Sequence, residues 1–319
     1  MTHPPRALPT RPEDVPAAVD TELLRALLER GRPPAVDGDA DDVVIWLHGL
    51  GHDAWDFGRV IALRPSGLQT RAFDLPGFGP HILDAPPRAI DLADLVDSLV
   101  AAARACPKPP VVAASSLGGH VALIAAMEHP GIFAGLSLLA PGGLVSAPST
   151  TEAMLRRYYD VAAIMGRADE DIVRNSRRIF VRPGTASDEL ATRKLSWHRA
   201  TPAAKEQFAV PFSTIVDDVL KRPIHDVVHQ LDGLPMQVLY GDGDVVVPLA
   251  SGRLLERVCH AQLTIMRNTG HTPHLEDPEA TAHLVYAFAH GVFAAIAASS
   301  SSSSSSASPS SSSLQQGAR

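Results

Sequence analysis

The sequence predicts an α/β protein, a doubly wound and mostly parallel sheet with an inserted α-helical lid. Two observations predict this fold class. Short β-branched runs alternate with stretches of helical periodicity along most of the chain, which is the pattern of strands joined by crossover helices. The alternation stops over residues 144–231, where helical periodicity continues without a recognisable strand. Because an unstructured loop of that length is uncommon in a compact domain, we interpret this stretch as a helical lid insertion.

The two ends of the chain differ in composition from the middle. Residues 1–20 are rich in proline and are predicted to form an extended, loosely held arm. The next stretch, "TELLRALLERG", predicts a helix with Thr21 as its N-cap and Gly31 as its stop. The serine-rich residues 299–319 bury too little apolar area to offset chain entropy, so we predict a disordered tail.

The remaining residues form the α/β core in two parts, 21–143 and 232–298, on either side of the insertion. Strands are predicted at Val43–Leu47, Gln69–Phe73, Val111–Ala114, Leu136–Leu139, Met236–Tyr240 and Gln262–Met266. Core helices are predicted at Ile90–Ala105, Leu117–His129, Leu249–Val258 and Glu279–Ala298. Because ligands of such sheets bind beyond the carboxyl ends of the strands, we look for chemistry where each strand ends.

The overall composition excludes several classes of function. Of the 319 residues 45% are hydrophobic and 20% charged, which is typical of a globular enzyme. The net charge of −7 argues against a nucleic-acid partner, because no basic stripe would neutralise many phosphates. We recognise no secretory segment and no uninterrupted apolar run of the roughly 20 residues that a bilayer requires. We expect a cytoplasmic protein without a membrane partner, acting on a small-molecule substrate.

Two adjacent serines, Ser115 and Ser116, follow the third predicted strand in "VVAASSLGG". A nucleophile at a strand-to-helix turn needs small residues two positions before and after it, because strand and helix approach closely there. Ser116 has the small residues Ala114 and Gly118 at these positions. Ser115 has Ala113 and Leu117, and the leucine side chain would collide with the strand. We therefore predict Ser116 as the nucleophile; the alternative is a serine that caps the helix without chemistry.

A serine hydroxyl needs a base, and the base needs an acid to orient it. His271 lies in the loop after the last strand, in "NTGHTPHLEDP", and is favoured over His274, which is closer to the next helix. Asp244 reaches out of the turn after strand Met236–Tyr240, whereas Asp242 is expected to bind turn amides. Serine, aspartate and histidine also follow one another in the chain order expected for this arrangement.

Two backbone N–H groups are candidates for an oxyanion hole. One belongs to Leu117, directly after Ser116. The other belongs to Leu50, in "WLHGLG" after the first strand, where flanking glycines allow a close approach. His48 in the same loop is interpreted as structural.

Five blocks of the sequence resemble the signature blocks of the α/β-hydrolase fold superfamily: "WLHGLGHDAWDF", "FDLPGFG", "ASSLGGHVAL", "LYGDGDVVVP" and "GHTPHLEDP". They are most similar to the lid-bearing branch that contains serine esterases, C–C hydrolases and proline iminopeptidases. The resemblance implies Ser116, Asp244 and His271 as the catalytic triad, Leu50 and Leu117 as oxyanion donors, and residues 144–231 as the lid.

The chain departs from the family pattern in three ways. Ser115 stands where many relatives have histidine or glutamine. Few residues precede Val43, so the usual first two antiparallel strands are expected to be shortened or replaced by the helix at Thr21. "LLAPGGL" is similar to C–C hydrolases of aromatic-ring degradation, but the tryptophan usual after their base is missing after His271.

These observations leave three hypotheses for the function. We favour a serine hydrolase that cleaves a small carboxylic ester or thioester through an acyl-enzyme on Ser116. The alternatives are a C–C hydrolase or lyase/cyclase that uses the same triad for proton shuttling, and a non-catalytic ligand-binding protein of this fold. No cofactor and no metal are expected, because the sequence has neither a nucleotide-binding glycine fingerprint nor metal-ligand spacing.

From Thr151 to Gln230 the insertion contains 13 Lys and Arg against 11 Asp and Glu, a local charge of +2 in a chain of −7. This difference fits a polar or acidic substrate, and it fits solvated helix faces equally well. Three aromatic residues of the insertion, Tyr158, Tyr159 and Trp197, either line a pocket or pack in the core of the lid, and we favour packing for each.

Overall fold

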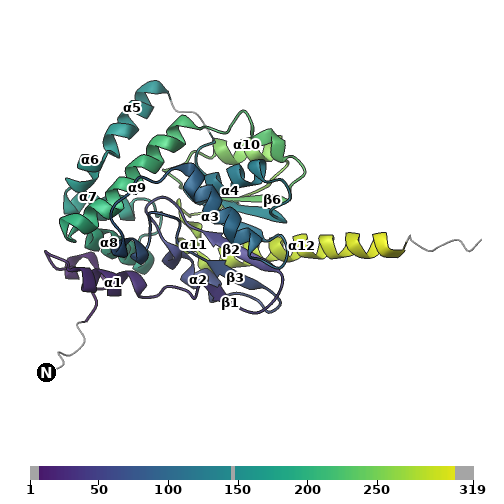
Figure 1. Ribbon diagram of the computed structural model, residues 1–319, viewed down its shortest axis with the longest axis horizontal. Helices are drawn as coiled ribbons and strands as arrows, with labels where there is room; N and C mark the ends of the chain where they lie inside the picture. The colour runs from purple at the N-terminus through teal and green to yellow at the C-terminus, as the bar shows by residue number, and fades with distance from the viewer. Residues whose placement is uncertain (1–6, 145–147, 306–319) are drawn as a thin grey trace, which may run out of the picture.

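The computed structural model describes residues 7–144 and 148–305, which form a seven-stranded sheet flanked by helices (Figure 1). The strand order is β1-β3-β2-β4-β5-β6-β7. β1 runs antiparallel to β3, and the other neighbouring strands are parallel. The strands are β1 (Val36–Asp37), β2 (Val43–Leu47), β3 (Gln69–Ala72), β4 (Val111–Ser115), β5 (Gly135–Leu139), β6 (Met236–Gly241) and β7 (Gln262–Met266).

Helices cover both faces of the sheet, which confirms the predicted fold class. One face packs against α3 (Leu92–Arg104), α4 (Leu117–Glu128) and α10 (Ala250–Val258). The other packs against α2 (Gly58–Ile61) and α12 (Pro278–Ser305). All residues of β2, β4, β5 and β6 are buried, which is why these strands appear as continuous apolar runs in the sequence.

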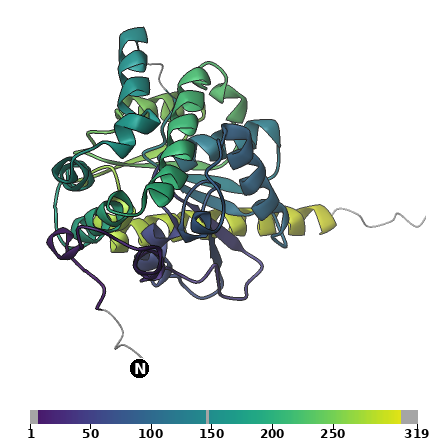
Figure 2. The same cartoon turned by 60° about the vertical axis from the view of Figure 1, so that its left-hand side comes forward.

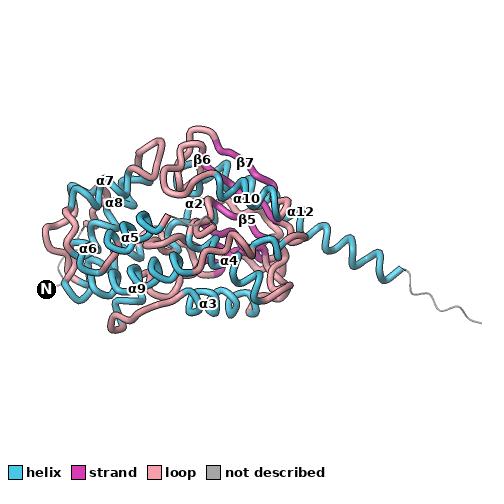
Figure 3. The backbone as a smooth tube through the Cα atoms, turned by 90° about the horizontal axis from the view of Figure 1, so that it is seen from above, coloured by secondary structure: helices cyan, strands magenta, loops and turns pink. Residues whose placement is uncertain are grey.

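The helical insertion follows β5 and returns to the sheet at β6. Its helices gather at one end of the molecule, and the strands lie at the other (Figure 3). They are α5 (Ser149–Tyr158), α6 (Val161–Met165), α7 (Asp169–Arg177), α8 (Thr185–His198) and α9 (Pro202–Lys221). The remaining α-helices of the described residues are α1 (Thr21–Glu29) and α11 (Pro273–Glu276). The same residues also contain four short 3-10 helices, at Pro12–Asp14, Ala54–Phe57, Pro80–Asp84 and Val228–Leu231.

The N-terminal segment is not the loosely held arm that its composition predicted. From residue 7 onward it is packed, with Val15 and Val19 buried in a cluster that includes α1 and Leu195 and Trp197 of α8. The N–H of Val19 also donates to the carbonyl of Arg199 at 2.9 Å. Helix α1 begins one residue earlier than expected, because Asp20 rather than Thr21 is the N-cap and accepts from the N–H of Leu23 at 2.7 Å.

Arg193 of α8 joins the insertion to the N-terminal part of the chain. Its buried guanidinium donates to the carbonyls of Leu27 and Leu28 at the end of α1 and to Asp53 Oδ2, at 2.7, 2.9 and 2.7 Å. The carbonyls at a helix end have no partner within the helix, so the guanidinium satisfies groups that burial would otherwise leave unpaired. The insertion is therefore held against the core at a fixed position beside the site.

The last helix, α12, extends farther than predicted and projects beyond the body (Figures 1 and 2). It continues to Ser305, so residues 299–305 are helical where a disordered tail was expected, and residues 306–319 lie outside the described residues. Residues Pro278–Ser300 are long and apolar enough to cross a membrane by length and composition alone, although no uninterrupted apolar run was recognised there in the sequence. Val285 and Tyr286 are buried against the sheet, as in the core helix of a globular domain.

Candidate active site

The backbone at Ser116 has an unusual conformation at the junction of β4 and α4. Its φ of 51° and ψ of −112° are rarely adopted by a residue other than glycine, at a cost of about 1–3 kcal/mol. The strain is held by hydrogen bonds: Ser116 N–H donates to the carbonyl of Leu139, and its carbonyl accepts from Gly142 N–H, at 2.9 and 3.0 Å. Ser115 belongs to β4 and is buried. Of the two adjacent serines, Ser116 has the conformation that an exposed nucleophile at a strand-to-helix turn requires.

The small residues around Ser116 are needed for close backbone packing. A Cβ added to Gly118 would lie 2.7 Å from the carbonyl oxygens of Leu47 and His48. A Cβ added to Gly119 would lie 2.7 Å from the Cβ of Pro141. These distances are shorter than real contacts, so α4 starts against the ends of β2 and β5 only because it begins with glycines.

The two predicted oxyanion donors lie beside Ser116. Leu117 is the first residue of α4, where a backbone N–H has no partner within the helix. Leu50 follows Gly49, and a Cβ on Gly49 would lie 3.2 Å from the Cβ of Ser116, so this loop is in contact with the serine. Both leucine N–H groups are free of hydrogen bonds to other described residues and remain available for a bound oxygen.

The structure brings His271 and Asp244 into hydrogen-bond contact. The alternative candidates, His274 and Asp242, have other partners. His271 Nδ1 lies 2.8 Å from Asp244 Oδ2, and both side chains are more than 90% buried. Asp244 Oδ1 accepts from the N–H groups of Val246 and Val247, at 2.7 and 3.0 Å, which fixes the plane of the carboxylate. Asp242 instead accepts from backbone N–H groups of the neighbouring turn, as its position in the sequence indicated.

The loop that carries His271 is fastened to the insertion. The N–H of His271 donates to the carbonyl of Ile179 at 2.8 Å. The buried carboxylate of Glu276 accepts from the N–H groups of Val181, Arg182 and Gly270, at 3.0, 3.0 and 3.1 Å. One side chain therefore joins the segment between α7 and α8 to the histidine loop, and no signal in the sequence indicated this link.

Two other histidines near the site have structural contacts. His48 Nε2 accepts from the N–H of Leu75 at 2.9 Å, so its Nδ1 carries the proton and donates to the carbonyl of Gly49 at 2.8 Å. His274 is fully buried, and the centroid of its ring lies 5.1 Å from that of the Phe57 ring. Both agree with the interpretation of these residues from the sequence.

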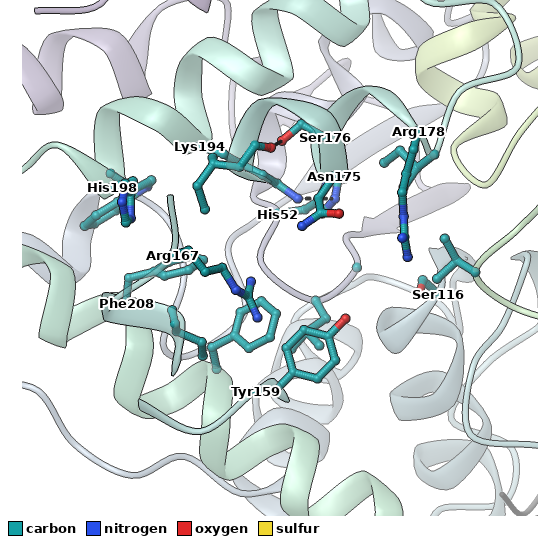
Figure 4. A pocket seen from close by; sticks show the side chains of 18 of the residues that line it. His52, Ser116, Tyr159, Arg167, Asn175, Ser176, Arg178, Lys194, His198 and Phe208 are labelled. Carbon is teal, nitrogen blue, oxygen red and sulfur yellow. Dashed lines mark hydrogen bonds between the residues drawn. The ribbon is translucent and has the colours of Figure 1, made fainter. Parts of the chain in front are cut away.

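A cavity of about 240 Å³ lies between the carboxyl ends of the strands and the insertion. On the side of the sheet it is lined by Ser116, His271, Gly49 and Leu50. Figure 4 shows Ser116 among the lining side chains. The insertion also contributes three aromatic side chains to the lining. Trp197 packs in the buried cluster with α1, as expected of it, and the cavity gives it a second role. Tyr158, Tyr159 and Trp197 all line the cavity, while Trp197 also stacks on Phe208 with centroids 5.6 Å apart.

A second histidine–carboxylate pair faces the same cavity. His52 Nδ1 lies 2.7 Å from Asp56 Oδ2, and His52 Nε2 lies 3.3 Å from Lys194 Nζ of α8 (Figure 4). Because an ionised carboxylate only accepts, His52 donates from Nδ1 and accepts from the lysine at Nε2. Hydrogen bonds from His52 and His274 hold the pKa of Asp56 below its usual range, although burial opposes this shift.

Burial also lowers the pKa values of His52 and Lys194, the two basic groups in this chain of hydrogen bonds. It lowers the pKa of His52 to about 4, against the attraction of Asp56, so the imidazole is neutral at pH 7. It lowers the pKa of Lys194 to about 8; the charge of Arg167 adds to this effect and that of Asp56 opposes it. Sequence reasoning missed Lys194 because its partner is 142 residues away in the chain.

Replacing Lys194 with methionine is expected to stabilise the folded protein at neutral pH. The folded-state pKa of about 8 is lower than the ordinary value of 10.5, so the folded state binds fewer protons between these pH values. The buried charge therefore lowers the free energy of unfolding by its full amount below pH 8, and this destabilisation disappears as the pH rises to 10.5. We expect Lys194→Met to raise the free energy of unfolding by up to about 3 kcal/mol at pH 7, and by less near pH 9.5.

Urea unfolding at these two pH values measures the effect. Lys221→Met, at the exposed end of α9, is the matched control and should leave the free energy of unfolding nearly unchanged. A destabilised Lys194→Met protein at neutral pH would mean that the ammonium contributes to stability and is not held at a cost.

The fold and the site define a member of a known family. The model of the alpha/beta hydrolase family matches residues 44–284, so the chain belongs to this family. A pimeloyl-acyl-carrier-protein methyl ester esterase from Aromatoleum aromaticum is 28% identical over 260 residues, covering 78% of this chain and 98% of the relative. A monoacylglycerol lipase from Mus musculus is 23% identical over 284 residues, covering 82% of this chain and 78% of the relative.

Solved structures have the same fold. A thermophilic esterase from Thermogutta terrifontis superposes with a TM-score of 0.67 at 18% identity, covering 81% of this chain and 93% of the other. MenH from S. aureus also gives a TM-score of 0.67, at 16% identity and with 80% of this chain covered and 96% of the other. At such identities the likeness concerns the fold.

Proposed function

We propose that the protein is a serine hydrolase that cleaves carboxylic esters or thioesters through an acyl-enzyme on Ser116. The observation that carries this proposal is the arrangement around the cavity: a serine with strained backbone and a histidine bonded to a buried carboxylate line the same space. The relatives named as esterases and lipases support the same class of reaction.

The first half of the proposed reaction forms the acyl-enzyme. Ser116 Oγ attacks the carbonyl carbon while His271 Nε2 takes the hydroxyl proton. Asp244 accepts the Nδ1–H of His271 and stabilises the imidazolium that results. The carbonyl oxygen becomes an oxyanion and accepts from the N–H groups of Leu50 and Leu117. When the tetrahedral intermediate collapses, the bond to the alcohol or thiol breaks and His271 delivers its proton to the leaving group.

The second half repeats these steps with water. His271 removes a proton from a water molecule, whose oxygen attacks the acyl carbon, and the same two N–H groups stabilise the new oxyanion. The bond to Ser116 Oγ then breaks, and the serine recovers its proton from His271. The products are a carboxylic acid and the free enzyme.

The segment that motivated the C–C hydrolase hypothesis has a packing explanation. The N–H of Gly142 donates a hydrogen bond to the carbonyl of Ser116. A Cβ on Gly143 would lie 2.1 Å from Nδ1 of His120, so only glycine fits there. Pro141 packs directly on Gly119. "APGG" therefore shapes the turn beneath the nucleophile, and this role is independent of the bond that is cleaved.

Steady-state hydrolysis tests the proposal. We expect the purified protein to hydrolyse 4-nitrophenyl butyrate and a butyryl thioester of N-acetylcysteamine with kcat/KM of about 10⁴ M⁻¹s⁻¹ or higher for the better substrate. Consumption of a vinylogous 1,5-diketone, followed by its colour, is the comparison assay. Turnover of the diketone without turnover of either ester would overturn the proposal in favour of C–C bond cleavage.

A further inference from the structure

The lining of the cavity is positively charged. The insertion contributes the side chains of Arg167, Arg178, Lys194 and Lys205. Among the described residues that line the cavity, none is aspartate or glutamate. The chain as a whole carries a net charge of −7, so this concentration of one sign does not reflect the average composition. A cavity with low-dielectric walls strengthens the attraction between such charges and an anionic ligand.

Lys194 is held in place inside the cavity without a carboxylate directly on its ammonium. Its Nζ donates to His52 Nε2 at 3.3 Å, and this neutral imidazole is itself oriented by Asp56. The ammonium has three donors, so the contact with His52 leaves donors for a ligand. Burial disfavours the charged lysine, and an anion beside it would remove this penalty.

Arg167 presents a second preorganised cation. Its guanidinium stacks over the ring of Tyr158, with Cζ 4.4 Å from the centroid, and over that of Tyr159 at 5.4 Å. One nitrogen donates to the carbonyl of Tyr158 at 2.8 Å, and the other edge of the guanidinium is left for a ligand. Stacking and this single hydrogen bond fix the side chain with little loss of its bidentate capacity.

Figure 4 shows how these groups are arranged relative to the nucleophile. Ser116 lies at one side of the cavity, and Arg167 and Lys194 lie at the opposite side and point into it. The side chain of Arg178 lies on the side of Ser116 and extends toward it. A ligand with a carbonyl carbon at Ser116 therefore reaches the two cations with a distant part of its structure.

We propose that Arg167 and Lys194 form an anion subsite that binds a carboxylate or phosphate of the substrate while its ester or thioester carbonyl lies at Ser116. This inference rests on the proposed function and narrows its substrate class to esters that carry a distal negative charge. The guanidinium binds two oxygens of the anion, and the ammonium neutralises it from a second direction. Apolar and aromatic side chains that also line the cavity, among them Tyr159, Met165 and Phe212, accommodate the chain that connects the two ends of the substrate.

The first arm of the experiment places the charge on the acyl side. The mono-4-nitrophenyl ester of glutaric acid is compared with 4-nitrophenyl valerate, which has an acyl chain of equal carbon number without the carboxylate. We expect kcat/KM to be about 10- to 100-fold higher for the charged ester, the value expected for charge-assisted hydrogen bonds. The second arm places phosphates on the leaving group, with butyryl-coenzyme A compared with butyryl-N-acetylcysteamine. A preference confined to one arm identifies the side of the scissile bond that carries the anion.

Variants test whether the named residues cause the preference. Lys194→Met and Arg167→Gln are expected to lower the ratio of charged to neutral kcat/KM by about tenfold or more each. Arg157→Gln is the matched control, because Arg157 is exposed on α5 and does not line the cavity. It removes one positive charge from the same insertion and should leave the ratio unchanged.

Binding without turnover separates the failure of this inference from failure of the proposed function. Calorimetric titration of the wild-type protein with glutarate should give a dissociation constant that rises about tenfold in Lys194→Met. If the protein binds glutarate but hydrolyses no ester, the anion subsite is supported and the proposed function is overturned. Ester hydrolysis with no charge preference in either arm, or an equal loss of the ratio in Arg157→Gln, would overturn the subsite.

Discussion

Replacing Ser116 with alanine is expected to abolish ester hydrolysis while the protein remains folded. In the proposed mechanism Ser116 Oγ forms the covalent intermediate, and the loss of such a nucleophile lowers kcat by about 10⁴- to 10⁶-fold. Alanine removes only the hydroxyl, and the backbone contacts that hold φ at 51° come from Leu139 and Gly142 and persist. The hydrolysis rate of 4-nitrophenyl butyrate measures the effect, with circular dichroism as the test of folding.

Ser115→Ala is the matched control for this experiment. Ser115 precedes Ser116 directly and is the last residue of β4, with its side chain buried. Its replacement is expected to change kcat/KM by less than about tenfold, because its hydroxyl takes no part in the proposed chemistry. Equal losses in the two variants would indicate that the experiment reports damage to the turn. Full activity in Ser116→Ala would exclude the acyl-enzyme.

The second large effect is expected for Asp244→Asn. The carboxylate accepts from Val246 and Val247 at Oδ1 and from His271 at Oδ2. In asparagine the single oxygen is needed by the two backbone N–H groups, so the amide nitrogen faces His271 Nδ1. The imidazole then accepts at Nδ1 and carries its own proton on Nε2. A protonated Nε2 has no free lone pair, so His271 is unable to take the serine proton. We expect kcat to fall by about 10⁴-fold.

Asp242→Asn is the control for this change of charge. Asp242 accepts at Oδ1 from the N–H of Asn268 at 2.7 Å, and an asparagine oxygen is able to accept the same bond. Its kcat is expected to stay within a few-fold of the wild-type value. A loss in Asp242→Asn as large as in Asp244→Asn would show that the turn, and not the hydrogen bond to His271, determines activity.

The α/β core was predictable because its signals are local. The strands Val43–Leu47 and Gln262–Met266 have the bounds that the sequence indicated, and the other four differ by one residue. Each is a short apolar or β-branched run between turn residues. The edge strand Val36–Asp37 agrees with the expectation of a shortened antiparallel start. Its bounds were not predictable, because two residues have no periodicity and pair only through Arg71 and Thr70.

The ends of the chain were predicted less well because their structure depends on distant contacts. The N-terminal arm is packed because Val15 and Val19 bury against α8, which is more than 160 residues away in the sequence. At the other end, the helix beginning at Pro278 continues through the first serines of the tail. Serine has only a moderate preference against helices, so a helix that is already nucleated extends into it.

The grouping of the candidate site residues at one edge of the sheet was predictable, because their signals in the sequence are local as well. Ser116, His271 and Asp244 each follow a strand, and the order of strands in a parallel sheet brings their carboxyl ends together. The cationic lining was not predictable, because its residues come from helices whose packing decides which side chains face inward. The total charge of the insertion left a polar substrate and solvated surfaces equally open. In the structure Arg167 and Lys194 line the cavity, which supports the proposed anionic substrate, while other cations of the insertion such as Arg157 are exposed to solvent.

Mass-spectrometric mapping of a fluorophosphonate adduct tests the central claim most directly. The probe reacts with serine hydroxyls that are activated by a neighbouring base. The account predicts one adduct on Ser116 in the wild-type protein, retained in Ser115→Ala, lost in Ser116→Ala and strongly slowed in Asp244→Asn. An adduct on Ser115, or no adduct on correctly folded wild-type protein, would contradict it.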